Sequence, residues 1–189
     1  MSFCLGLGLS ACCGFRIFVP LLVSNIFALA GWHNFSAGFE WLSSWTAFYL
    51  LLSATLIEIT AYYIPWLDNI LDQIALPIAA IVGTLLATSA FSAEISPVMR
   101  WGLGVMVGGG SAGLIHAGTS LLRMGSSATT GGIANPVLAT AENGSAITFS
   151  VLALLIPVMI GILMLLLVIF VFRKVFARFS RKSATDIKS

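Results

Sequence analysis

Long apolar runs, separated by shorter polar stretches, follow one another along the whole chain. An α-helix crosses the hydrocarbon core of a bilayer in about 17–25 apolar residues. Five runs reach this length, at residues 5–30, 46–63, 74–91, 99–122 and 146–172. The pattern predicts an all-α polytopic membrane protein with about five transmembrane helices, separated by stretches of which the longest is the Gly/Ser/Thr-rich 123–145.

The composition excludes a water-soluble fold. Hydrophobic residues make up 59% of the 189 residues and charged residues only 8%, and the mean hydropathy is +1.04. A soluble domain with this balance would expose large apolar patches. We therefore expect a single transmembrane helical domain over residues 1–172, followed by a basic tail over residues 173–189. Membrane lipids are then its immediate partners.

The distribution of cations predicts the orientation. Lys and Arg near the ends of spanning helices favour the cytoplasmic side. Six of the nine Lys and Arg residues follow the last apolar run: Arg173, Lys174, Arg178, Arg181, Lys182 and Lys188. We expect a multi-pass protein of the inner (cytoplasmic) membrane with a cytoplasmic C-terminus and, after five crossings, an outer N-terminus.

The same orientation places other charges on opposite sides. Arg100 falls on the inner side, whereas Asp68, Asp72 and Glu142 fall on the outer side. The only basic cluster is the short tail beside the membrane, so nucleic-acid binding is not expected.

Several polar residues lie within the predicted spans, where each costs free energy unless it is paired or hydrated. Arg16 lies near the middle of the first run, Glu58 inside the second and His116 in the fourth. Such residues are candidates for function by default. The simplest arrangement is an ion pair between Arg16 and Glu58, which equally serves a purely structural role. His116 has a structural alternative too, because a Ser or Thr on a neighbouring helix satisfies a neutral imidazole.

Two acidic residues form a separate pattern. Asp68 and Asp72 are four residues apart, so on a helix they share one face. Like charges at this spacing repel one another unless a cation or an Arg lies between them. Either this segment is a solvated surface helix, or the pair forms a mouth that attracts cations.

Glycines and prolines mark candidate structural and hinge positions: Gly14, Pro20, Gly108, Gly109, Gly110 and Pro136. The pairs Gly104/Gly108 and Gly109/Gly113 have the small-xxx-small spacing that lets helices approach closely. The alternative is a helix break at residues 108–111, with free N–H groups facing a cavity, and a re-entrant loop over residues 125–136.

Short internal similarities suggest an inverted repeat. Ser10-Ala11 followed by Arg16 resembles Ser111-Ala112 followed by His116, and residues 65–72 resemble residues 136–142. If the first and fourth spans run in opposite directions, the halves are related as in inverted-topology transporters, with a site near the midplane where they meet.

These positions also resemble a known family. The run Ser-Ala-Cys-Cys-Gly-Phe-Arg-Ile-Phe-Val-Pro at residues 10–20, the later acidic positions and the Gly-rich segment 116–123 are similar to an uncharacterised bacterial integral-membrane family, domain of unknown function 4126. The similarity covers most of residues 5–170. It implies that the family's recurrent polar and turn positions are Gly14, Arg16, Pro20, Glu58, Asp68, Asp72, His116, Arg123, Pro136 and Glu142. Family members tend to carry Lys three residues after the His, where this chain has Thr119.

Three classes of function fit these features. A small transporter or channel for an ion, a small solute or a lipid headgroup accounts best for charges drawn from several spans. The candidate binding residues are Arg16, Glu58, Asp68, Asp72, His116, Arg123 and Glu142. A membrane-embedded enzyme that modifies lipids is the alternative, although no metalloprotease, hydrolase or nucleotide-binding motif supports catalysis or identifies a metal or cofactor. The third class is a structural or assembly subunit. The small-residue surfaces predict a homo-oligomer, most simply a dimer.

Overall fold

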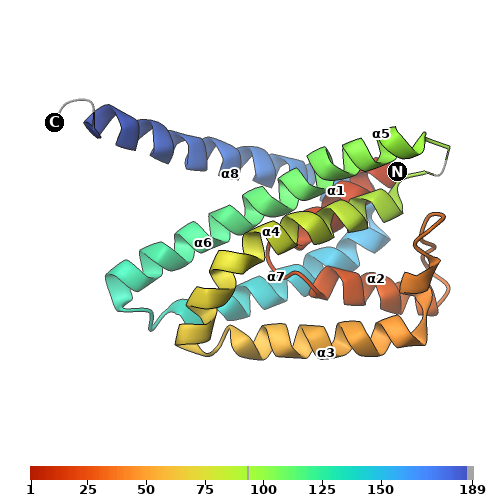
Figure 1. Ribbon diagram of the computed structural model, residues 1–189, viewed down its shortest axis with the longest axis horizontal. Helices are drawn as coiled ribbons and strands as arrows, with labels where there is room; N and C mark the ends of the chain where they lie inside the picture. The colour runs from red at the N-terminus through yellow and green to blue at the C-terminus, as the bar shows by residue number, and fades with distance from the viewer. Residues whose placement is uncertain (93, 187–189) are drawn as a thin grey trace.

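A computed structural model describes residues 1–92 and 94–186, without the side chains of residues 65, 66, 69 and 177–186. The chain forms helices joined by short turns, so the all-α prediction is confirmed (Figure 1). The elements are α1 (Ser2–Cys12), α2 (Val19–Leu29), the 3₁₀ turn η1 (Glu40–Ser43), α3 (Trp45–Ala61), α4 (Pro65–Ala90), α5 (Pro97–Leu103), the π-helical η2 (Gly104–Gly109), α6 (Gly110–Thr130), α7 (Asn135–Leu155) and α8 (Pro157–Asp186). Of the predicted tail, Lys188 lies outside the described residues, as do the side chains of Arg178, Arg181 and Lys182.

The long helices have the dimensions and surface of membrane spans. Within the described part of the chain, four helical stretches are long and apolar enough to cross a bilayer: Ile70–Ala90, Pro97–Thr130, Asn135–Leu155 and Pro157–Phe176. The shorter α3 has 17 residues and a length of about 26 Å, and it lies beside the other helices in Figure 1. The chain is thus a polytopic all-α protein of membrane character.

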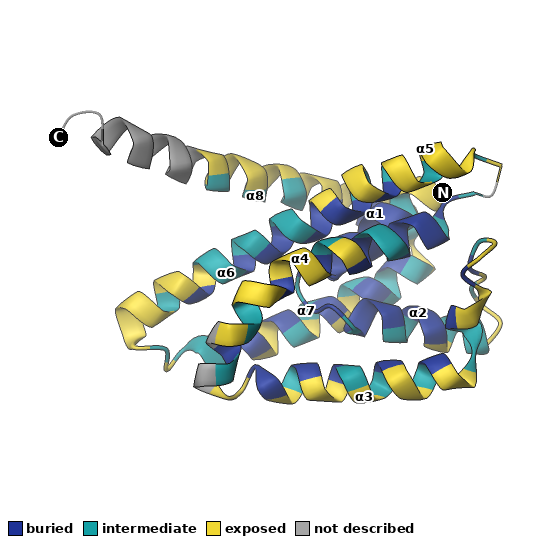
Figure 2. Ribbon diagram, in the orientation of Figure 1, coloured by how far each residue is buried: buried dark blue, intermediate teal, exposed yellow. Residues whose placement is uncertain are grey.

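The buried residues lie on the faces of the helices that point into the bundle. The largest fully buried apolar side chains include Leu9, Leu86, Ile115, Ile160 and Met164. Exposed residues cover the outer faces of the long helices, and α8 is exposed over most of its described surface (Figure 2). Many of these exposed residues are large and apolar, as expected where the surrounding solvent is lipid.

The first predicted span is wrong, because residues 5–30 do not form one helix. The chain leaves α1 after Cys12 and enters α2 at Val19, with Pro20 as the second residue of the new helix. Proline is well tolerated in the first turn of a helix, where its missing N–H would have no intrahelical partner. In Figure 1, the N-terminus and the end of α2 lie at the same end of the bundle, and the turn at residues 13–18 lies inside it. The two helices form a hairpin that enters the bundle and returns.

The predicted loop over residues 123–145 is also wrong. Hydroxyl groups of Thr129 and Thr130 donate back to the carbonyls of Gly125 and Ser126, so the Gly/Ser/Thr-rich stretch continues α6 until Gly131 ends it in the left-handed conformation. The re-entrant loop predicted over residues 125–136 is therefore not present. The predicted last span is divided at Pro157, because proline disfavours helix in the residue before it and cannot donate to the preceding turn.

The hairpin removes one predicted crossing and the division at Pro157 adds one, so the number of crossings stays at five. The segments between the first and last helices, however, lie on the opposite side from the one predicted. The start of α4, the α6–α7 turn and the C-terminal end of α8 all lie at one end of the bundle (Figure 1). Asp68, Asp72 and Glu142 therefore lie towards the end of the basic tail, and Arg100 in α5 lies towards the other end. The predicted separation of these acidic residues from the tail is wrong.

The glycines of the fourth span allow close packing and do not break the helix. Helix α5 runs through the π-helical η2 into α6. A Cβ added at Gly104 would collide with Thr88, one at Gly108 with Gly83 and one at Gly109 with Thr84. All three contacts are to α4, so these small residues serve helix packing within one chain. The alternative of a helix break at residues 108–111 is not observed.

The inverted repeat is not confirmed, because the similar segments run in the same direction along the bundle. The similar segments at residues 65–72 and 136–142 form the first turns of α4 and α7, which both begin at the same end of the bundle. Helices α1 and α5 likewise both begin at the other end (Figure 1).

Candidate functional site

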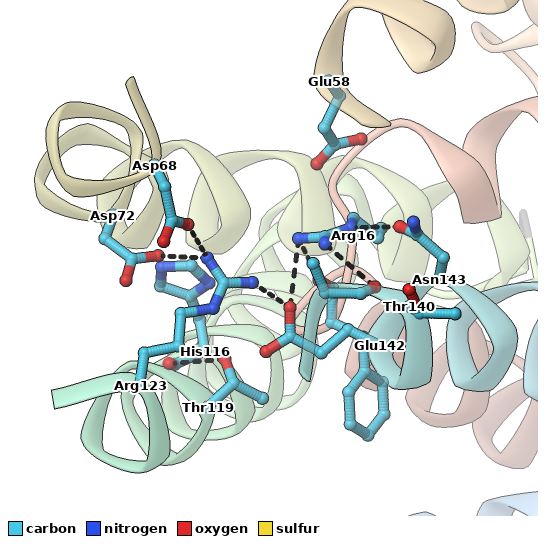
Figure 3. A network of polar contacts seen from close by, with 12 residues as sticks. Arg16, Glu58, Asp68, Asp72, His116, Thr119, Arg123, Thr140, Glu142 and Asn143 are labelled. Atoms are coloured by element: carbon cyan, nitrogen blue, oxygen red, sulfur yellow. Dashed lines mark hydrogen bonds and ion pairs between the residues drawn. The ribbon is translucent and has the colours of Figure 1, made fainter. Parts of the chain in front are cut away.

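Arg123 lies at the centre of a buried network of charged side chains (Figure 3). It extends from α6, and its Nη1 atom donates to Asp68 Oδ1 at 2.6 Å and to Asp72 Oδ1 at 3.1 Å. Its Nη2 atom donates to the Glu142 carboxylate. Asp68 and Asp72 share a face of α4, as their spacing predicts, and the cation between them is this arginine. One side chain thus joins α4, α6 and α7.

Arg16 extends the network to the turn between α1 and α2. Its Nη1 atom lies 3.1 Å from Glu142 Oε2, the same oxygen that accepts from Arg123. Its Nη2 atom donates to the carbonyl of Ala139 at 3.2 Å, and its Nε atom donates to Asn143 Oδ1. Arg16 therefore fixes the α1–α2 turn against α7, and Glu142 joins the two guanidinium groups.

Glu58 has a different role from the one predicted. Its Oε1 atom accepts from the backbone N–H of Ile17 at 2.6 Å, and its Oε2 atom accepts from that of Phe18 at 3.0 Å. The predicted ion pair of Glu58 with Arg16 is wrong, because Glu58 caps the start of α2 and the ion-pair partner of Arg16 is Glu142. N–H groups at a helix start have no intrahelical partner, so an acceptor from another helix is needed where water is excluded. The negative charge also interacts favourably with the helix dipole.

Two members of the network are absent from the sequence prediction. Tyr62, which follows α3, has both guanidinium groups against its ring: Arg16 Cζ lies 3.9 Å and Arg123 Cζ 4.3 Å from the ring centroid. Asn143 accepts from Arg16. Tyr62 resembles an interfacial aromatic residue in the sequence, but it is buried. Its position three residues before Pro65 was the one available signal that it lies at a helix turn.

His116 lies beside the network and is anchored to other groups. Its Nδ1 atom donates to the carbonyl of Gly14 at 3.3 Å, and its Nε2 atom lies 3.4 Å from the Ser120 hydroxyl. Only glycine fits at position 14, because a Cβ there would lie 2.5 Å from the carbonyl oxygen of Ala112. This close approach lets the histidine reach the α1–α2 turn. Thr119 donates to the carbonyl of His116 and completes this side of the site.

The remaining structural candidates lie at helix starts. Pro136 is the second residue of α7, as Pro20 is of α2. Both fix the start of a helix that carries or supports a member of the network. Gly110 begins α6 and faces open space.

The charges of the network do not balance. Two arginines, Arg16 and Arg123, pair with the carboxylates of Asp68, Asp72 and Glu142, and Glu58 adds a fourth carboxylate bound to the backbone next to Arg16, which leaves two excess negative charges when all are ionised. The side chains are largely dry: exposed fractions are 1% for Arg16, 5% for Arg123, 3% for Asp68 and 9% for Glu142. Asp72, at 20%, is the most exposed carboxylate of the ion pairs. Excess charge in a dry site is costly, so the arrangement favours binding of a proton or a cation.

Metal ligation has less support. Among the described residues, no group of three His, Cys, Asp or Glu side chains is arranged to hold a metal ion. Arg123 occupies the space between Asp68, Asp72 and Glu142, so a metal ion ligated by all three carboxylates at once does not fit while Arg123 is there.

The fold and the site define a class of protein: a polytopic all-α protein in which a helical hairpin and the long helices enclose a network of ion pairs. The model of one family, the domain of unknown function DUF4126, matches residues 3–177, and the chain belongs to that family. Comparison with curated proteins and with solved structures found no match.

Proposed function

We propose that this protein is a small transporter or channel-like protein of the bacterial cytoplasmic membrane, and that its charge network binds a proton or a small cation. The observation that carries the proposal is the excess of four carboxylates over two guanidinium groups in a largely dry site. Ionisable residues at membrane depth are rare and mark ion pathways and proton relays. A network that only held the helices together would cost less free energy with equal numbers of positive and negative charges.

The arrangement of the helices supports this class. Transporter sites are commonly built from discontinuous helices whose exposed backbone groups line a protected interior. The α1–α2 hairpin has this form, and its turn carries Arg16 into the network. The α3, α4, α6 and α7 helices supply the remaining charges, so a small rearrangement of any of them changes the partners of Arg123 and Glu142.

Access to the network is best at Asp72. Asp68 lies three residues after the start of α4, Arg123 seven before the end of α6, and Glu142 seven after the start of α7, which places the network about one to two helical turns from that end. The basic tail at the same end favours a cytoplasmic location. We therefore propose that Asp72 exchanges a cation or proton with the cytoplasm, and that the outer route opens by movement of the hairpin.

The test is cation flux in proteoliposomes. Wild-type protein should move H⁺, Na⁺ or K⁺ down an imposed gradient. Asp72→Asn should eliminate the flux while leaving yield and melting temperature near the wild-type values, because Arg123 keeps Asp68 and Glu142 as partners. Glu94→Gln, which neutralises an exposed carboxylate remote from the network, is the matched control and should conduct normally. Flux of none of the three cations by wild-type protein, or full flux by Asp72→Asn, would refute the proposal.

A structural or assembly subunit is the second candidate, because both guanidinium groups have several partners each. In that case Asp72→Asn would lower stability and change no flux. The homodimer stays a proposal with either function. Since Gly104, Gly108 and Gly109 pack against α4 of the same chain, a dimer would need another surface, and native mass spectrometry in mild detergent tests for it.

A further inference from the structure

A groove between α6 and α8 lies outside the charge network. Its volume is about 480 Å³, within the range of about 300–1,000 Å³ that is usual for ligand pockets. The wall is almost entirely apolar, and it includes Phe15, Leu122, Leu167, Phe170 and Val171. Apart from Phe15, its residues come from α6 and α8, which are both long and apolar enough to cross a membrane, so the groove opens where lipid surrounds the protein.

Lys174 lies at this groove. Among the described residues of the lining it is the only charged side chain, and none of them is a carboxylate. The adjoining surface of α8 carries Leu166, Ile169, Phe170, Arg173 and Lys174 and is apolar except for its two cations. This surface shares Phe170 and Lys174 with the groove, and the Lys174 Nζ atom lies 5.4 Å from the centroid of the Phe170 ring. The apolar groove and this apolar surface thus meet beside two neighbouring cations.

The depth of the cations matches that of a lipid headgroup. The apolar run of α8 ends at Phe172, and Arg173 and Lys174 follow it directly, where long cationic side chains reach the interface. Cations at this depth attract anionic lipids.

We propose that the groove binds an acyl chain of an anionic phospholipid, whose phosphate contacts Lys174 and Arg173. The other acyl chain lies along the adjoining surface of α8. A second copy of the protein is a weaker candidate, because the described lining residues include no carboxylate that could pair with Lys174 of the other copy. The site is independent of the charge network, since neither Lys174 nor Arg173 contributes to it.

Two glycines define the shape of the groove. A Cβ at Gly118 would lie 2.9 Å from Val171 Cγ1, so α6 and α8 touch there. At Gly125, two turns further along α6, a Cβ would meet no atom within 4 Å. The helices therefore diverge from Gly118 towards Gly125, and a large side chain at Gly125 would fill the groove without a clash.

The experiment adds phosphatidylglycerol or phosphatidylcholine with identical acyl chains to the purified full-length protein and follows binding by the rise in melting temperature. Wild-type protein should bind the anionic phosphatidylglycerol more tightly than the zwitterionic phosphatidylcholine. Lys174→Ala should bind it about fivefold more weakly and lose the preference, whereas Arg100→Ala, at the other end, should keep it. Gly125→Leu should lose the response to both lipids. Gly144→Leu, which adds the same side chain at an open position of α7, should respond like wild type.

Three outcomes would overturn the proposal: equal binding of both lipids by wild-type protein, an unchanged lipid response of Gly125→Leu, or a dimer that Gly125→Leu converts to monomers without loss of lipid binding. The last would assign the groove to a second copy. If Gly125→Leu fails to fold, the exposed Lys174→Ala variant decides the question alone. Because neither variant alters a network residue, failure here leaves the flux proposal standing, and the reverse also holds.

Discussion

Arg123→Met tests whether the network holds the helices together as its geometry implies. The substitution keeps an unbranched apolar stem but removes the contacts to Asp68, Asp72 and Glu142 at once. Breaking one buried ion pair typically costs about 3–5 kcal/mol, because the partner is left charged and unpaired. The three pairs share one guanidinium, so their costs do not add. We expect a loss of about 3–5 kcal/mol, or a fall of about 6–20 °C in melting temperature.

The assay is thermal unfolding in one detergent at one heating rate, with Arg100→Met as the control cation. The control should stay within about 0.5 kcal/mol of wild type. Adding Asp68→Asn to Arg123→Met removes one stranded carboxylate and should recover about 0.5–3 kcal/mol. The reasoning is refuted if Arg123→Met melts like the control, or if the double variant is no more stable than Arg123→Met.

Three further predictions concern the hairpin and the orientation. Glu58→Gln leaves one of two backbone N–H groups without an acceptor and should cost about 1–3 kcal/mol in the same melting assay; an unchanged melting temperature would contradict the capping role. Gly14→Ala should cost about 1–3 kcal/mol by overpacking against α6, whereas Gly144→Ala should not destabilise the protein. In a background without native cysteines, Trp32→Cys should react with an impermeant thiol reagent outside the cell and Ile133→Cys should not; the reverse labelling would invert the topology.

The sequence predicts the class of fold well, but it locates the helix ends poorly. Apolar length identifies spans, yet it does not distinguish a span from a hairpin, because residues 13–18 are nearly as apolar as the helices around them. Hydroxyl-rich residues 123–130 resemble a loop and form a helix, since their side chains bond to the preceding turn. Pro157 is the residue of the long apolar run at which one helix ends and the next begins.

The charged residues were easier to find than their partners. Arg16, Glu58 and Arg123 are easy to recognise in the sequence, because charged residues are rare in segments that lie in hydrocarbon. Which carboxylate meets which arginine depends on the helix order around the bundle. The contribution of Tyr62 depends on its orientation, which no pattern in the sequence indicates.

The dependence of the hairpin on Glu58 and Glu142 has a consequence for biogenesis. Residues 13–18 leave the ribosome before α3 and α7, so the N–H groups of Ile17 and Phe18 have no acceptor until α3 arrives, and Arg16 has no counter-ion until α7 arrives. A bilayer does not tolerate these groups unpaired. The hairpin therefore waits at the interface or in the insertion machinery, and it takes its final position only after most of the later helices have entered the membrane.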